Sequence, residues 1–255
     1  MKDPNELIFT RSTLEAAMAT NCGYYHGHSV QERFAVETPI LIKALDGLLR
    51  DCSIVMDYGI GVGRVTKAIL KQYPHLRVIG VDNSDRMLGF ARQYIPTEYF
   101  DEGQVELYST QDLKKIGSAS IDLILAVYVL MHISERNLET TFDELSRVMN
   151  EQGKLYVFNQ TGRSVPRENR WGIYRGLRVL TGFLDEISQY KQAQRMLLKV
   201  DNRTIFHNDG IDIQKELEKK FRPLHDVPLD SHPLVELLMR RHFSRVYAKR
   251  LKISE

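Results

Sequence analysis

The sequence contains few cysteines, no long hydrophobic run and little net charge. Cys22 and Cys52 are its only cysteines, which excludes a disulfide framework or a zinc cluster and favours a reducing compartment. The longest apolar run, LILAVYVLM at 123–131, is too short to cross a bilayer, and the N-terminus lacks the apolar core of a signal peptide. A formal charge of +2 gives no argument for a nucleic-acid or membrane partner. We therefore expect a soluble, cytoplasmic protein without a resident metal.

The centre of the chain alternates two kinds of pattern. Short β-like runs are followed by amphipathic helical runs, which is typical of a mostly parallel sheet with helices on both faces. Ser84 is the expected N-cap of the second helix, which ends before Pro96. The sequence predicts strands over 53–59, 77–82, 105–109 and 121–129, a turn and a strand within 150–159, and helices over 63–74, 84–95 and 136–149.

Two regions lie outside this alternation. Residues 1–50 look helical, with a strongly amphipathic stretch at 31–49, and residues 160–204 interrupt the pattern after the fifth strand. We therefore divide the chain into an N-terminal helical segment, 1–50, and an α/β domain, 51–255, that includes this insertion. The tail of the domain predicts a helix over 210–221, a strand over 223–230, a short helix, and a last strand over 242–252.

A glycine-rich turn follows the first predicted strand. Gly59, Gly61 and Gly63 form a GxGxG pattern, and ligands of open parallel sheets bind beyond the carboxyl ends of the strands. Asp57 precedes the glycines, where it would repel a pyrophosphate but would suit a ligand with an ammonium group. Asp82 ends the second strand, where a carboxylate accepts hydrogen bonds from ribose hydroxyls. The pattern favours a cationic, ribose-bearing ligand over a dinucleotide, whose GxGxxG fingerprint the sequence does not complete.

Each of these residues also has a purely structural interpretation. Glycines after a strand can serve only to make a tight turn into a helix. Asp57 can accept hydrogen bonds from helix N-terminal amides, and Asp82 can be favoured by the dipole of the next helix. At single positions the sequence leaves both interpretations open.

Four stretches resemble, in order and spacing, the motifs of the class I S-adenosylmethionine-dependent methyltransferases: VMDYGIGVGRVT, VIGVDNSDRML, DLILAVYVLMHI and ELSRVMNEQGKLYVFN. The resemblance covers about residues 50–160, and the tail resembles the family's terminal helix and antiparallel strand pair. It implies an open, mostly parallel seven-stranded sheet with an antiparallel last strand, and S-adenosyl-L-methionine as cofactor. It further implies that the N-terminal segment forms a lid over the cofactor and that the insertion lies on the substrate side.

The resemblance also implies where the cofactor binds. Asp57 and the glycines would hold its methionine part, Asp82 would hold the ribose, and Ala126 would lie under the methionine moiety. Ser109 departs from the acid that the family often has for the adenine amino group, so this contact would pass to neighbouring residues. The implied cofactor-binding residues are Asp57, Gly59, Gly61, Gly63, Asp82, Asn83, Met87, Thr110, Gln111, Asp112 and Ala126.

The acceptor side is less defined. His132 follows the fourth strand, where many relatives also carry a histidine, and is the candidate general base; the alternative is a capping or packing histidine. A segment near residue 26 would contact the substrate from the lid, or would simply pack beneath a helix. Arginines and aromatics within 163–178 suit an anionic or planar acceptor, or form a solvated helix face around the only tryptophan. The candidate substrate residues are Tyr24, Tyr25, His28, Arg163, Arg170, Trp171 and Tyr174.

The function predicted from these features is methyl transfer to an oxygen or nitrogen atom of a small molecule by in-line displacement, which depends chiefly on alignment. Methyl transfer to RNA or protein is the first alternative; basic segments favour it, while the small net charge and the lack of an RNA-binding module oppose it. A regulatory domain that binds the cofactor without turnover is the second alternative, and an NAD-dependent dehydrogenase is the third. A homodimer stays open.

Overall fold

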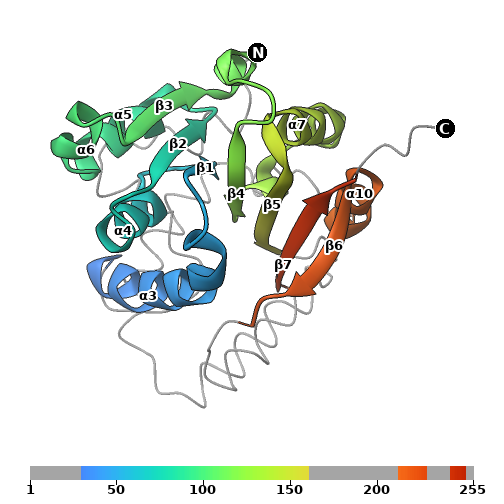
Figure 1. The fold of residues 1–255 in the computed structure, drawn as a ribbon, viewed down its shortest axis with the longest axis horizontal. Helices are drawn as coiled ribbons and strands as arrows, with labels where there is room; N and C mark the ends of the chain where they lie inside the picture. Colours follow the sequence, from blue (N-terminus) through green and yellow to red (C-terminus); the bar gives the residue numbers. More distant parts are fainter. Residues whose placement is uncertain (1–29, 161–211, 229–241, 251–255) are drawn as a thin grey trace, which may run out of the picture.

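Seven strands form one sheet at the centre of the described structure (Figure 1). The computed structural model describes residues 30–160, 212–228 and 242–250. The strands are β1 (Ile54–Tyr58), β2 (Arg77–Asp82), β3 (Val105–Ser109), β4 (Ile121–Val127), β5 (Met149–Gln160), β6 (Phe221–Asp226) and β7 (His242–Lys249). Their order across the sheet is β3-β2-β1-β4-β5-β7-β6.

The directions of the strands follow the prediction. β1 pairs in parallel with β2 and with β4, β2 pairs in parallel with β3, and β4 pairs in parallel with β5. β7 is antiparallel to both β5 and β6. The strand order reverses between β1 and β4, which is the position where open α/β sheets bind their ligands. The expected mostly parallel, seven-stranded sheet with an antiparallel last strand is confirmed.

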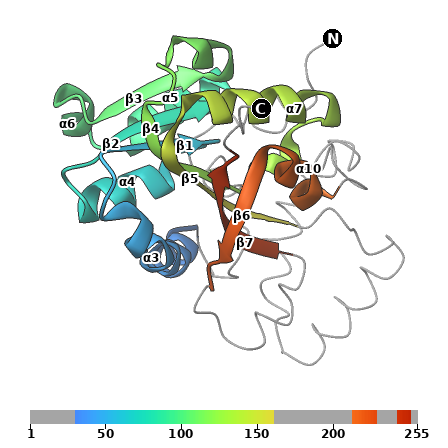
Figure 2. The same cartoon turned by 45° about the vertical axis from the view of Figure 1, so that its right-hand side comes forward.

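Helices cover both faces of the sheet (Figures 1 and 2). On one face pack α3 (Val30–Leu49), α4 (Arg64–Gln72) and α5 (Asp85–Tyr94), and on the other α7 (Glu135–Val148) and α10 (Ile213–Lys220). The connections hold a short helix and two 3-10 segments: α6 (Thr97–Asp101), η1 (Thr110–Lys115) and η2 (Leu130–His132). Val55 and Met56 of β1 enter opposite cores, because successive side chains of a strand point to opposite faces.

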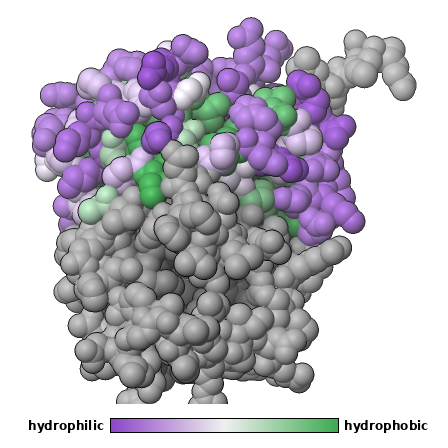
Figure 3. Space-filling model, turned by 90° about the horizontal axis from the view of Figure 1, so that it is seen from below, coloured by the Kyte–Doolittle hydropathy of each residue, from purple (hydrophilic) through white to green (hydrophobic). Residues whose placement is uncertain are grey.

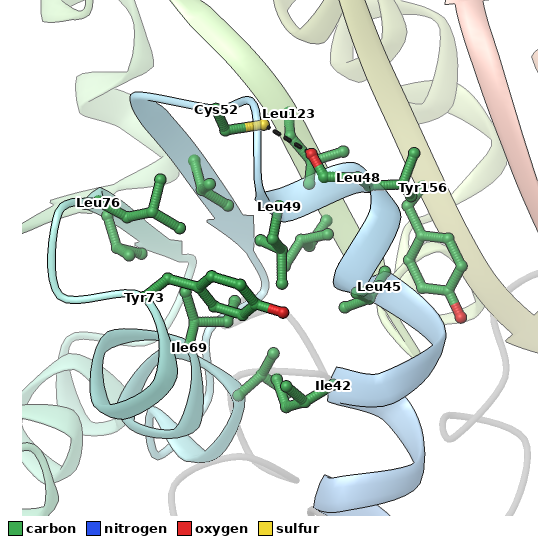
Figure 4. Packing of buried hydrophobic residues seen from close by; sticks show 14 of the residues in the cluster. Ile42, Leu45, Leu48, Leu49, Cys52, Ile69, Tyr73, Leu76, Leu123 and Tyr156 are labelled. Atoms are coloured by element: carbon green, nitrogen blue, oxygen red, sulfur yellow. Dashed lines mark hydrogen bonds between the residues drawn. The ribbon is translucent and has the colours of Figure 1, made fainter.

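Aliphatic side chains of α3 and α4 fill the first of these cores (Figure 4). Leu45 of α3 and Ile69 of α4 are both fully buried there. The thiol of Cys52 donates a hydrogen bond to the carbonyl oxygen of Leu48 at 3.0 Å, and burial raises its pKa to about 11. The thiol therefore stays protonated at neutral pH and serves packing rather than chemistry. Cys22 lies outside the described residues.

The described surface is mostly hydrophilic. Figure 3 shows small hydrophobic areas among hydrophilic side chains on the face seen from below. Leu224 of β6, 38% exposed, is the one exposed large hydrophobic residue among those that the structure describes. Within the same ranges, no helix is long and apolar enough to cross a membrane.

The structure departs from the sequence prediction in two respects. β5 begins at Met149 rather than after a turn, because residues 150–153 bulge out of its pairing with β4. Between the pairs Ile121–Met149 and Leu123–Lys154, β5 advances by five residues and β4 by two. The sequence pattern also predicts none of α6, η1 and η2, since segments this short show no helical period.

Several predicted regions fall outside the described residues. They are the first part of the N-terminal segment, 1–29, the insertion from residue 161 onward, and the short helix expected before β7. The division of the chain at residue 50 therefore stays a prediction. The helix expected at 31–49 is confirmed as α3.

Candidate functional site

The glycine-rich turn between β1 and α4 is tied to the end of β2. Its glycines all have a positive φ, 79° at Gly59, 57° at Gly61 and 81° at Gly63. The amides of Gly59 and Ile60 both donate to the carbonyl oxygen of Val81, at 2.7 and 3.0 Å. The turn therefore continues the pairing of β1 with β2 for two more residues before α4 begins.

The protein's own packing requires glycine at two of these positions. A Cβ atom at Gly59 would overlap the side chain of Val129, and one at Gly63 would lie 2.5 Å from Cδ1 of Ile95. Both overlaps add to the backbone strain that a positive φ imposes on other residues. The structural interpretation of the sequence therefore accounts for Gly59 and Gly63 without a ligand.

Asp57 lies at the carboxyl end of β1 and is 3% exposed. The hydroxyl of Thr66 in α4 donates a hydrogen bond to its carboxylate at 2.7 Å. Burial raises the pKa of Asp57 to about 6, against the lowering effects of Thr66 and of the nearby Arg64 charge, and Asp82 raises it further. At neutral pH the carboxylate is thus largely ionised, but at a high desolvation cost.

Asp82 ends β2 and is 8% exposed. One oxygen accepts from the amide of Gly61 at 2.9 Å and the other from the amide of Ser84 at 3.0 Å. Burial raises the pKa of Asp82 to about 6, although these backbone hydrogen bonds lower it. Ser84 caps α5 as predicted, since its hydroxyl accepts from the amide of Met87 at 3.3 Å. Asp82 therefore joins the glycine-rich turn to the start of α5.

The predicted adenine contacts lie where β3 passes into η1. Ser109 pairs with Asp82 across β2 and β3, so the position that departs from the family pattern lies next to the predicted ribose ligand. The Ser109 hydroxyl donates to Asp112 at 2.8 Å, and Lys115 forms an ion pair with Asp112 at 2.7 Å. These two groups, Lys115 first, hold the pKa of Asp112 below its usual value. Asp112 is thus engaged within its own segment, whereas Gln111 is exposed.

The other predicted cofactor residues differ in exposure. Thr110 begins η1 and is half-buried. Asn83 is exposed, whereas Met87 is 1% exposed and Ala126, near the end of β4, is fully buried. Together with Asp57, Asp82 and the glycine-rich turn, these residues come from the carboxyl ends of neighbouring parallel strands, where the sequence places them.

The connection after β4 holds the candidate base and one residue that the sequence does not indicate. His132 is the last residue of η2 and half-buried, and its amide donates to the carbonyl oxygen of Val129 at 2.9 Å. Tyr128 has a φ of 56°, which a tyrosine adopts only under constraint. Its amide donates to the carbonyl oxygen of Phe158 at 2.7 Å, and the two ring centroids lie 4.6 Å apart. Strained residues of this kind cluster at functional sites, but no sequence pattern predicts this one.

The predicted substrate residues cannot be placed beside these groups. Tyr24, Tyr25, His28, Arg163, Arg170, Trp171 and Tyr174 all lie outside the described residues. Within the described ranges, no group of three or more histidine, cysteine, aspartate or glutamate side chains could hold a metal ion.

The chain resembles known proteins in both sequence and fold. Residues 55–153 match the sequence model of a family described as a methyltransferase domain. A trans-aconitate 2-methyltransferase of Azoarcus sp. (strain BH72) is 33% identical over 109 residues, which are 43% of this chain and 40% of that protein. The matched part thus spans less than half the length of this curated relative.

Two solved structures share the fold over most of the chain. One is a protein of Pyrococcus horikoshii, with 18% identity, a TM-score of 0.55, and coverage of 88% of this chain and 93% of the other. The second is human N-acetylserotonin methyltransferase in complex with S-adenosylmethionine, with 16% identity, a TM-score of 0.52, and coverage of 87% and 54%.

The matched residues run from β1 through the start of β5, which includes the glycine-rich turn, Asp57, Asp82 and the connection with His132. The strand order and the antiparallel β7 are those implied by the motif resemblance. Family match, sheet topology and structural neighbours agree, and the chain belongs to the class I S-adenosylmethionine-dependent methyltransferase family.

Proposed function

We propose that the protein transfers a methyl group from S-adenosylmethionine to an oxygen or nitrogen atom of a small molecule. The observation that carries the proposal is the pair of buried carboxylates, Asp57 and Asp82, at the ends of adjacent strands. Burial raises the pKa of both to about 6, and the charge of Asp82 raises that of Asp57 further. A ligand with positive charge and hydroxyl donors would offset the cost of holding both groups ionised.

The donor chemistry of this ligand fits the two carboxylates. Asp57 would face the ammonium group of the methionine part. Each oxygen of Asp82 accepts one backbone amide, and a carboxylate oxygen can accept about two hydrogen bonds, so capacity remains for the ribose hydroxyls. The glycine-rich turn, which Asp82 fixes through Gly61, would lie against the methionine part.

The adenine would lie beside the start of η1. Asp112 is held by Ser109 and Lys115, so we assign the polar contact to the amide of Thr110 and the side chain of Gln111. Asn83 and Met87, which follow Asp82 along the chain, would flank the adenosine from the other side.

Bound S-adenosylmethionine supplies a methyl group that is already activated on a sulfonium. The chain then has to align the acceptor and exclude water, which is worth about 7–11 kcal/mol in well-oriented reactions. Ala126, fully buried in β4, would support the methionine part from below. His132 would take a proton from the acceptor, a step that contributes about 10²–10⁴-fold in rate where it is needed.

A small carboxylic acid is the acceptor class that we favour. The name of the Azoarcus relative, trans-aconitate 2-methyltransferase, supports an anionic small molecule, as do the arginines of the insertion. Arg163 and Arg170 would bind its carboxylates, and Trp171 and Tyr174 would pack against it. From the lid, Tyr24, Tyr25 and His28 would close over the site.

Calorimetry with S-adenosylmethionine and S-adenosylhomocysteine tests the first step. We expect both to bind, and Asp82→Asn to weaken binding by about tenfold or more, because a hydrogen bond to a charged group is worth about 1.5–3 kcal/mol. The control is Asp101→Asn, which changes an exposed aspartate at the end of α6 and should leave binding unchanged. If neither compound binds the wild-type protein, the proposal is wrong.

Incubation with labelled S-adenosylmethionine and a panel of small carboxylic acids, trans-aconitate among them, tests the second step. We expect label in one of the acids. Label that enters only RNA or protein would contradict the small-molecule acceptor, and binding without any label transfer to these three classes would favour a regulatory domain.

A further inference from the structure

One guanidinium on α7 uses all of its donors within the protein. Arg147 lies in the last turn of α7, and its side chain is 29% exposed. Its Nε and Nη2 donate to the carboxylate of Glu144 at 3.0 and 2.8 Å. Its Nη1 donates to the carbonyl oxygen of Ile116 at 2.9 Å and the hydroxyl of Ser118 at 3.2 Å, and Nη2 also donates to the carbonyl oxygen of Leu113 at 2.9 Å. An arginine has five N–H donors, and each makes one of these hydrogen bonds.

Three of the acceptors belong to one segment, the end of η1 and the turn after it. The last carbonyl groups of a helix have no partner within the helix, and Arg147 supplies one to Leu113 and one to Ile116. The same turn is joined to α7 by its backbone, since the amide of Ala119 donates to the carbonyl oxygen of Arg147 at 2.9 Å. The C-terminal end of η1 is therefore fastened to the C-terminal end of α7.

The side chains under this segment are buried in the core on the α7 face. Leu113 and Ile116 are each 5% exposed and pack in the core that also holds Leu145 of α7. The guanidinium spans the segment above them, so a shift of η1 along the sheet would break several hydrogen bonds and disturb this packing together. Such a fork can hold two carbonyl groups in fixed positions, which a lysine ammonium on a flexible stem cannot do.

The opposite end of η1 carries the predicted adenine contacts. η1 begins at Thr110, directly after β3, and its first turn is closed by the hydrogen bond between Ser109 and Asp112. η1 has six residues, so the position of its last carbonyl groups limits where Thr110 and Gln111 can lie. We propose that Arg147 is a positioning residue that holds Thr110 and Gln111 in place for the adenine of the cofactor. The inference rests on the proposed function, because the adenine contact is part of it.

The test compares Arg147→Lys with the wild type in calorimetry with S-adenosylhomocysteine and with S-inosylhomocysteine, in which the adenine amino group is replaced by oxygen. We expect the wild type to prefer the adenine compound. In Arg147→Lys we expect affinity for that compound to fall by about tenfold, the effect of about one lost hydrogen bond, while affinity for the inosine compound changes by less than about threefold. A merely structural role would lower the unfolding temperature without changing the ratio of the two affinities.

Two further variants complete the design. Arg136→Lys changes an exposed arginine of the same helix and should leave both affinities unchanged. Glu144→Ala removes the carboxylate that orients the guanidinium and should move the ratio in the same direction by a smaller factor, which keeps the inference testable if Arg147→Lys fails to fold. An unchanged ratio in folded Arg147→Lys, or in Glu144→Ala when the lysine variant does not fold, overturns the role of Arg147 and leaves the proposed function intact. Failure of the wild type to bind S-adenosylhomocysteine overturns the proposed function and this inference with it.

Discussion

Replacing Gly63 by alanine separates two costs that meet in the glycine-rich turn. The residue has a φ of 81°, which costs an alanine about 1–2 kcal/mol relative to its preferred conformations. The new methyl group would also lie 2.5 Å from Cδ1 and 2.8 Å from Cγ1 of Ile95. Overpacking of this kind typically costs about 1–3 kcal/mol. We therefore expect Gly63→Ala to lower the free energy of unfolding by about 2–5 kcal/mol.

The chain provides a matched control at Gly103. Its φ is 70°, and a Cβ atom there would meet no heavy atom within 4 Å. Gly103→Ala should therefore show the backbone cost alone, about 1–2 kcal/mol. Urea unfolding followed by circular dichroism measures both variants, and the difference between them isolates the contact with Ile95.

Ile95→Val tests that contact directly. It removes Cδ1, the nearest atom to the added methyl group, and by itself should cost about 0.5–1.5 kcal/mol. The double variant with Gly63→Ala should be more stable than the sum of the single effects by about 1 kcal/mol. If Gly63→Ala costs no more than Gly103→Ala, or if the two changes at 63 and 95 simply add, the packing account of this glycine is refuted.

Two further predictions concern buried and partly buried carboxylates. Burial raises the pKa of Asp57 and Asp82 from 3.8 to about 6, so between these values the folded protein binds protons that the unfolded chain does not. The ligand-free protein should therefore become more stable as pH falls from about 6 to about 4, by up to about 3 kcal/mol per group, and lose that gain as pH rises again. Thermal unfolding at several pH values measures this, and a pH profile that Asp82→Asn leaves unchanged would contradict it. Asp122 accepts from the amides of Ser53 and Ile54 at 2.7 and 2.9 Å; Asp122→Ala should cost about 1–3 kcal/mol in urea unfolding because these donors lose their partner, and a cost near zero would show that water replaces it.

Local signals explain why most of the parallel half of the sheet could be predicted. β2 begins and ends at the predicted residues, 77 and 82, because an apolar run is bounded by a turn on one side and the cap of α5 on the other. Ser84 caps that helix as expected, and α5 ends before Pro96 because a proline disfavours helical geometry in the residue before it. Where neighbouring residues decide the structure, the sequence pattern is sufficient.

Contacts between distant residues explain what could not be predicted. The bulge at 150–153 is held by Asn150, whose side-chain amide donates to Asp122 at 2.7 Å, a contact between two strands. The hydrogen bond of Asp57 with Thr66 and the five hydrogen bonds of Arg147 likewise join elements that only the fold brings together. Tyr128 adopts a positive φ through its contacts with Phe158 at the end of β5, and its residue type gives no sign of this.

The order of the last strands has a consequence for synthesis on the ribosome. β7 lies between β5 and β6, and Lys154 of β5 pairs with Ala248 of β7. The five parallel strands can therefore assemble first, as N-terminal parts of a chain commonly do, while one edge of β5 stays open to other chains. β6 cannot close that edge, because among the described strands it pairs with β7 alone. The nascent protein thus remains prone to aggregation until residue 249 has left the ribosome.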